Sequence, residues 1–201
     1  MVKSSPILAH FREHDPVLFS LFTSPPKRLT AEPPKAYFES LCRTIIGQQL
    51  STTVADVIYG RFEALFDKKE ITPKTVLNTP DESLRKIGMS GAKARFVKDL
   101  ATKVANKDIT LTALTTMGEQ EVIATLTTIK GVGPWTAEMF LMFTLGREDV
   151  FSFGDLGLKR AIQELYKLKR EPSKHYMQKL SRKWSPYRTY AALALWDFKD
   201  R

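Results

Sequence analysis

The sequence predicts an all-α protein, and three observations lead to this prediction. Apolar residues recur at intervals of three and four through most of the 201-residue chain, which places them on one face of a helix. Serine, threonine or proline begins several of these segments and glycine ends others, as at helix termini. We find no stretch in which apolar and polar residues alternate as they do in a strand. A chain of this length can bury a real core, as one large or two small domains.

The first helical pattern runs from Ile7 to Phe22, and Pro16 threatens to break it. A proline-rich connector follows at residues 24–34, and the next helix extends from Tyr37 to Gly47. Ser51 begins another helix as its N-cap. Its expected core stripe consists of Val54, Val57, Ile58, Phe62, Leu65 and Phe66.

Later helix starts carry similar signals. Thr72-Pro73 and Thr79-Pro80 each combine a capping side chain with a proline, as in the first turn of a helix. Residues 88–91 form a turn with two glycines before a basic helix at residues 92–104. Further helices are expected at residues 119–129, 134–145, 155–167, 174–183 and 186–198.

Charge and composition restrict the partners. The net charge is +9 and the isoelectric point is about 9.6, which favours a polyanion such as a nucleic acid, although a merely soluble basic protein fits equally well. No apolar run of about 18 residues occurs, so no membrane span is expected. The first residues lack an apolar signal core, and we therefore expect an intracellular protein.

Cys42 is the only cysteine, which excludes an internal disulfide and a four-cysteine iron–sulfur or zinc site. It lies in an apolar helix pattern and is expected in the core. His10, His14 and His175 are scattered and give no metal-binding pattern. His14 and Asp15 are expected to cap or expose a helix end.

Residues 126–137 read as a helix end, a tight hairpin and a new helix start. Gly131 and Gly133 allow backbone torsions and close approaches that a Cβ would prevent. Pro134 suits the first turn of the following helix, whose free N–H groups can bind a phosphate lying against the glycines. An ordinary turn between two helices explains these residues about as well.

Three segments together resemble one family. They are residues 129–137 (IKGVGPWTA) with Asp149 to Phe151 and Asp155 after them, residues 46–51 (IGQQLS) and residues 184–191 (WSPYRTYA). This combination resembles the helix-hairpin-helix (HhH-GPD) DNA glycosylase superfamily, in its 3-methyladenine DNA glycosylase II, or alkylbase, branch. The resemblance covers residues 37–196.

The resemblance implies an all-α, two-lobed fold with the active site between the lobes. The central lobe is expected at about residues 37–130 and the second lobe at residues 1–36 plus 131–201, with the hairpin at residues 126–137.

The family's essential carboxylate corresponds to Asp155. Breaking an N-glycosidic bond builds positive charge on the sugar, and a carboxylate beneath the sugar stabilises that charge or orients the attacking water. Local sequence alone favours a different role, because Asp155 also stands where a helix N-cap belongs. Both roles can coexist in one side chain.

The resemblance also assigns a base pocket to Trp135, Met139 and Trp196. Family members that cleave the DNA backbone carry a lysine at the position of Trp135, and a tryptophan cannot form an imine, so water is the expected nucleophile and no lyase activity is expected. Aromatic faces attract cationic N-alkylated purines. Met139 replaces a tyrosine of some relatives, which leaves the base range open. Core packing is the alternative for Trp196.

DNA contacts are implied at two turns and at the hairpin. Gln49 corresponds to a wedge that fills the gap left by an extruded base, and a plain polar turn residue is the alternative. The expected DNA-binding residues are Gln48, Gln49, Leu50, Gly91, Lys93, Lys130, Gly131, Val132 and Gly133. For Lys130, a plain surface role fits equally well. The resemblance further implies a monovalent cation, Na⁺ or K⁺, on the backbone carbonyls of Thr127, Ile129 and Val132.

The expected activity is therefore hydrolysis of the N-glycosidic bond of alkylated purines in DNA, of the 3-methyladenine and 7-methylguanine type, which leaves an abasic site. The expected partner is double-stranded DNA with damaged bases, bound by a monomer that is expected to require no cofactor and to have no iron–sulfur cluster. The expected compartment is the cytoplasm or nucleoid of a bacterium or archaeon, or the nucleus of a eukaryote. Two alternatives stay open: a glycosylase for deaminated or mismatched bases, and a non-catalytic DNA-binding module.

Overall fold

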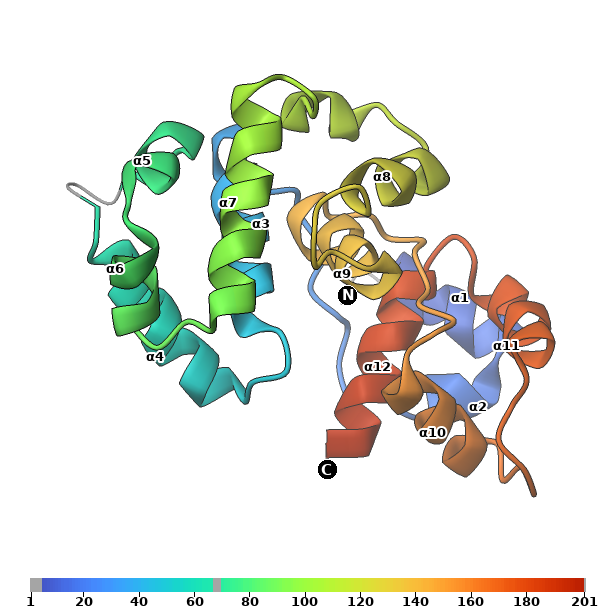
Figure 1. The fold of residues 1–201 in the computed structure, drawn as a ribbon. Helices are drawn as coiled ribbons and strands as arrows, with labels where there is room; N and C mark the ends of the chain where they lie inside the picture. The colour runs from blue at the N-terminus through green and yellow to red at the C-terminus, as the bar shows by residue number, and fades with distance from the viewer. Residues whose placement is uncertain (1–4, 67–69, 201) are drawn as a thin grey trace. The chain divides into compact units, whose positions relative to one another are not determined.

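The computed structural model describes residues 5–66 and 70–200, and the regular elements in these ranges are all helices (Figure 1). This confirms the all-α prediction. The α-helices are α1 (Pro6–His14), α2 (Pro16–Phe19), α3 (Tyr37–Gly47), α4 (Thr52–Glu63), α5 (Pro73–Asn78), α6 (Asp81–Lys86), α7 (Gly91–Ala105), α8 (Glu119–Leu126), α9 (Pro134–Met139), α10 (Leu156–Leu165), α11 (Lys174–Ser181) and α12 (Arg188–Asp200). Shorter 3-10 and π segments are η1 (Pro34–Ala36), η3 (Leu111–Thr115), η4 (Phe140–Thr144) and η5 (Arg182–Trp184). Within the described ranges, no helix is long and apolar enough to cross a membrane.

The chain forms two compact units, which we call the terminal unit (Met1–Thr30 with Gly146–Arg201) and the central unit (Ala31–Leu145). These boundaries differ from those expected from the sequence, because residues 31–36 and 131–145 belong to the central unit and not to the second lobe. The reason is local packing: α9 contacts α8, and η4 contacts α3.

In the central unit, α7 packs against α3, α5 and α6 (Figure 1). Cys42 on α3 is fully buried, as predicted, and burial raises the pKa of its thiol. The prediction of a buried apolar stripe on α4 is wrong in part. Val54 and Val57 are 45% and 49% exposed, and Leu65 is also exposed. The buried face of this segment is narrower and consists of Ile58, Tyr59, Phe62 and Phe66.

The terminal unit is built on α10 packed against α12 and on α1 packed against α2 and η5. Pro16 breaks the first helical pattern as predicted, and Asp15 caps α2 by accepting the Leu18 N–H at 3.1 Å. Asp15 is more than a cap, however. It is 3% exposed and also accepts the Tyr166 hydroxyl at 2.7 Å and the Trp184 indole N–H at 2.9 Å. It therefore ties the first helices to the rest of the unit.

The two helix N-termini predicted from a threonine followed by a proline differ from each other in the structure. Thr72 caps α5 in a capping box with Thr75, so Pro73 is the first helical residue. At the second site, Pro80 is itself the N-cap of α6, one residue later than predicted.

Candidate active site

The predicted hairpin forms between α8 and α9 in the central unit. Ile129 and Val132 are buried, and the Val132 N–H donates to the Ile129 carbonyl at 3.0 Å. Gly131 lies in the left-handed region with φ +78°, and Pro134 is the first residue of α9. The turn is therefore anchored by two apolar side chains and closed by one backbone hydrogen bond.

The two hairpin glycines differ in how much space surrounds their α-carbons. A Cβ on Gly131 would lie 2.5 Å from Cγ of Phe96 and closer still to two other ring atoms, so the ring of this α7 residue occupies the space. A Cβ on Gly133 would meet nothing within 4 Å. The sequence interpretation assigned both glycines to phosphate approach. Only Gly133 leaves its backbone open in this way.

The carbonyls of Thr127, Ile129 and Val132 stay a predicted cation site. The Ile129 carbonyl accepts the hydrogen bond that closes the turn. Carbonyl oxygens have two lone pairs, so this bond does not prevent ion binding. Within the described ranges, no cluster of histidine, cysteine and acidic side chains could hold a metal ion.

The α3–α4 turn is tied to the hairpin through Gln48. Its side-chain amide donates to the Gly131 carbonyl at 2.9 Å and to the Thr136 hydroxyl at 3.2 Å. Gln49 adopts a left-handed backbone conformation with φ 57° and is exposed, whereas Leu50 is half-buried. Of the two glutamines, Gln49 therefore stands at the exposed position expected of a wedge.

Lys93 points inward, toward the same turn. Its ammonium donates to the carbonyls of Ile46 at 2.8 Å and Gln48 at 2.7 Å, and burial lowers its pKa. A cation on these carbonyls stabilises the C-terminal end of α3. The structure thus gives the Lys93 ammonium internal partners that the sequence did not indicate, and its phosphate contact stays a prediction. Gly91 is the first residue of α7, behind the cap Ser90.

Lys130 is a surface residue of the hairpin, with its side chain 74% exposed. Its backbone N–H donates to Asp99 at 2.9 Å, and its ammonium lies 3.7 Å from the same carboxylate. This pair fixes the hairpin to α7 and leaves most of the lysine in solvent.

In the terminal unit, Asp155 is the N-cap of α10. Its Oδ1 accepts the Leu158 N–H at 2.8 Å, which confirms the capping prediction. The same oxygen accepts the Trp196 indole N–H from α12 at 3.2 Å. Trp196 is half-buried, so it is not a plain core residue as the alternative held. Two donors from two helices therefore hold one carboxylate oxygen.

Of the other expected pocket residues, Trp135 is 45% exposed near the start of α9. A large aromatic side chain with this exposure is available to a ligand. Met139, one turn later on the same helix, is 8% exposed and belongs mostly to the core of the central unit.

The structure also connects two of the segments that carried the resemblance. The Asp149 carboxylate accepts two hydrogen bonds from the Arg188 guanidinium, one on each oxygen, and a third from the Arg188 backbone N–H. It also accepts the Ser185 hydroxyl at 2.8 Å. Burial opposes ionisation of this carboxylate, but these hydrogen bonds outweigh it and lower the pKa of Asp149. Both residues lie in segments that carry the resemblance, and their opposite charges were the signal in the sequence from which this ion pair could have been predicted.

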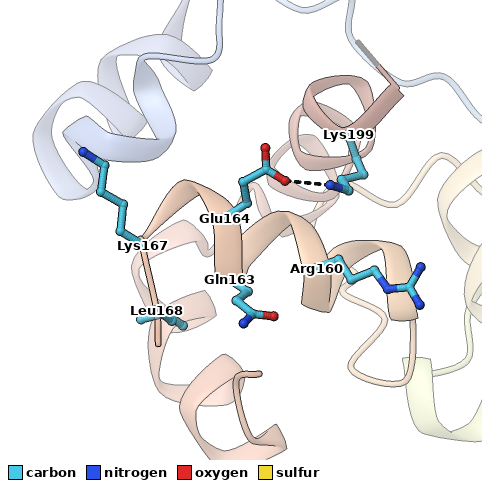
Figure 2. Close-up of a pocket in the computed structure, with 6 residues that line it drawn as sticks. All are labelled: Arg160, Gln163, Glu164, Lys167, Leu168 and Lys199. Carbon is cyan, nitrogen blue, oxygen red and sulfur yellow. Dashed lines mark hydrogen bonds and ion pairs between the residues drawn. The ribbon is translucent and has the colours of Figure 1, made fainter. Parts of the chain in front are cut away.

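A surface groove of about 520 Å³ lies along α10 and α12. Figure 2 shows the residues that line it. Arg160, Gln163 and Lys167 line it, and Glu164 forms a 2.6 Å ion pair with Lys199 across it. The predicted site residues are not among those that line this groove, so the expected chemistry is not assigned to it.

Comparisons with known proteins identify the family. Residues 42–186 match the family described as HhH-GPD superfamily base excision DNA repair protein. The chain belongs to this superfamily. Within it, the chain lies in the alkylbase glycosylase branch, as the sequence predicted.

Among the relatives, the alkylbase DNA glycosidase-like protein mag2 of Schizosaccharomyces pombe is 36% identical over 175 residues, which are 86% of this chain and 82% of that protein. YfjP of Bacillus subtilis is 32% identical over 79% of this chain, and the match spans 58% of that protein's length. The solved structure of the S. pombe 3-methyladenine DNA glycosylase Mag1 in complex with abasic DNA matches with a TM-score of 0.77 and 30% identity, over 95% of each chain. The predicted HhH-GPD fold is thereby confirmed.

Proposed function

We propose that this protein is a monofunctional DNA glycosylase that hydrolyses the N-glycosidic bond of alkylated purines in DNA and leaves an abasic site. The names of the relatives support the substrate class, and the Mag1 structure with abasic DNA supports DNA as the partner. The net charge of +9 supports a polyanionic partner as well.

The observation that carries the proposal is the anchored carboxylate of Asp155. Its Oδ1 is held by donors from α10 and α12, so the group is oriented before any substrate arrives. As the base leaves with the bonding electrons, positive charge develops on the sugar, and a preoriented carboxylate stabilises it without reorganising. Water then forms the new bond to C1′ and loses its proton, directly or through the carboxylate, to solvent.

The base itself supplies part of the driving force. A 3-methyladenine or 7-methylguanine base is cationic in DNA and leaves as a neutral molecule, so it needs little acid catalysis. The exposed indole of Trp135 offers an aromatic face to such a cation, an attraction of about 0.5–2 kcal/mol. Because tryptophan has no amine, we infer that this position forms no imine and that the enzyme has no lyase activity.

We assign DNA binding to the hairpin. Gly133 leaves its backbone open, and the N–H groups at the start of the next helix can bind a phosphate there. Lys130 adds an exposed positive charge beside it. A monomer without a required cofactor suffices for this reaction, since water is the only co-reactant.

Asp155→Asn tests the mechanism with little change in shape. The asparagine Oδ1 can still accept the two hydrogen bonds, so the folded state should persist while the negative charge is lost. We expect single-turnover release of 3-methyladenine to fall by about 10²–10³-fold or more, with abasic-DNA affinity retained. Undiminished release would reject Asp155 as the catalytic residue.

The substrate class and the nucleophile need their own assays. A panel of duplexes carrying 3-methyladenine, 7-methylguanine, hypoxanthine, uracil or a mismatch should show release of the alkylated purines first. Release confined to deaminated or mismatched bases, or no release at all, would favour one of the two alternatives. Borohydride should trap no covalent complex with abasic DNA, and a trapped complex would establish lyase chemistry.

A further inference from the structure

The contact between Trp196 and Asp155 stands apart from a stacking role for the indole. The Trp196 N–H donates to Oδ1 at 3.2 Å, and the Leu158 N–H donates to the same oxygen at 2.8 Å. A carboxylate that accepts from two directions at one oxygen is restricted in rotation. The N–H of the indole therefore performs a task that its aromatic face does not.

Gly157 provides the space for this contact. It is the second residue of α10 and has an ordinary helical backbone. A Cβ added there would lie 3.1 Å from Oδ1 of Asp155, 3.5 Å from Cδ1 of Trp196 and 3.6 Å from its Nε1. The carboxylate and the indole thus meet directly over the α-carbon of a glycine.

Neither intrinsic propensity nor backbone torsion explains glycine at this position. Glycine weakens a helix relative to alanine, and no positive φ requires it here. The close approach of the two side chains does explain it. A methyl group at 3.1 Å would displace the carboxylate by a few tenths of an ångström.

We propose that Trp196 is a positioning residue for Asp155, acting through its indole N–H, and that Gly157 is a glycine because this contact needs the space. The proposal rests on the proposed function, in which Asp155 stabilises the sugar cation. Loss of the N–H removes one of the restraints on the carboxylate, and the reaction must then restore part of that order. The loss appears in the rate of the chemical step and not in DNA binding.

The decisive variant removes only the N–H. Site-specific replacement of Trp196 by benzothienylalanine substitutes sulfur for the N–H and keeps the size and aromatic face of the side chain. We expect the single-turnover release of 3-methyladenine to fall by about 10–100-fold, the effect of one hydrogen bond to a charged group. Abasic-DNA affinity should stay within about twofold.

A role confined to stacking predicts a different result, because the isostere stacks as tryptophan does. An unchanged release rate would overturn the proposal. A different result would refute the proposed function itself, namely an Asp155→Asn variant that keeps the full rate of base release. An inactive Asp155→Asn with a fully active isostere would refute positioning and leave the proposed function in place.

Gly157→Ala is the second variant and tests the same contact from the other side. The added methyl should lower the release rate by about 3–30-fold through displacement of the carboxylate, while Tm stays equal or rises. Gly60→Ala in α4 is the matched control, because a Cβ there meets nothing within 4 Å. It should leave the rate unchanged. Full activity in Gly157→Ala would remove the assigned role of this glycine.

Discussion

Gly131→Ala should destabilise the fold through two separate effects. An alanine held at φ +78° costs about 1–2 kcal/mol because its Cβ crowds the carbonyl oxygen. The same Cβ would lie 2.5 Å from Phe96 Cγ, and forcing packed groups apart costs about 1–3 kcal/mol more. The free energy of unfolding should therefore fall by about 2–5 kcal/mol, which corresponds to a Tm lower by about 4–20 °C.

Thermal and urea unfolding, followed by circular dichroism, measure this loss. In a Phe96→Ala background the overlap is gone, so the further penalty of Gly131→Ala should shrink to the backbone cost of about 1–2 kcal/mol. An undiminished penalty in that background would refute the steric part of the reasoning.

Gly133→Ala is the matched control in the same hairpin. Its Cβ meets nothing within 4 Å and its φ is −93°, so Tm should change by less than about 2–4 °C. Its methyl group would instead stand on the open side of the turn and should weaken binding to abasic DNA. Normal binding by Gly133→Ala would contradict the assignment of this backbone to phosphate approach.

Three further predictions concern groups that hold the site in place. Asp15→Asn should lower the free energy of unfolding by about 2–4 kcal/mol in urea titrations, because an amide cannot accept from all three donors; an unchanged midpoint would refute this. Burial opposes ionisation of Asp149, but its hydrogen bonds from Arg188 and Ser185 outweigh burial and lower its folded-state pKa. Its stabilisation is therefore present above the unfolded-state pKa of about 4 and is lost as the pH falls through the folded-state pKa. Asp149→Asn should flatten the pH dependence of urea stability below about pH 4, and an unaltered pH profile would count against the pair. Lys93→Met should lower Tm and leave the salt dependence of DNA binding unchanged, whereas a phosphate contact would reduce that slope by about 1.

Features that depend on neighbours in the sequence could be predicted. The break at Pro16, the Thr72 cap and the hairpin all follow from residues within one turn of each other, and the structure confirms each of them. The α4 stripe failed for the opposite reason. Periodicity marks which residues can share a face, but packing against other helices decides how wide the buried face is.

The structural reason for each glycine could not be predicted from the sequence, because it depends on packing against other helices. A Cβ on Gly131 would overlap Phe96, and a Cβ on Gly157 would crowd the Asp155 oxygen that Trp196 holds; both aromatic residues lie more than 30 residues away from their glycine in the chain. A missing side chain leaves no pattern of its own. The internal contacts of Lys93 could not be predicted either, because a lysine in a first helical turn looks identical in sequence whether it faces solvent or the carbonyls of another helix.

The two roles weighed for Asp155 support each other. A cap requires one carboxylate oxygen to accept a backbone N–H of the first turn, and Oδ1 meets this requirement through Leu158. Catalysis requires the same group to be held still, and the capping bond does so together with the Trp196 indole. The N-terminus of α10 thus positions the negative charge of Asp155, so the carboxylate is oriented once α10 has folded. A substitution that weakened the cap would be expected to slow base release even where the carboxylate itself is kept.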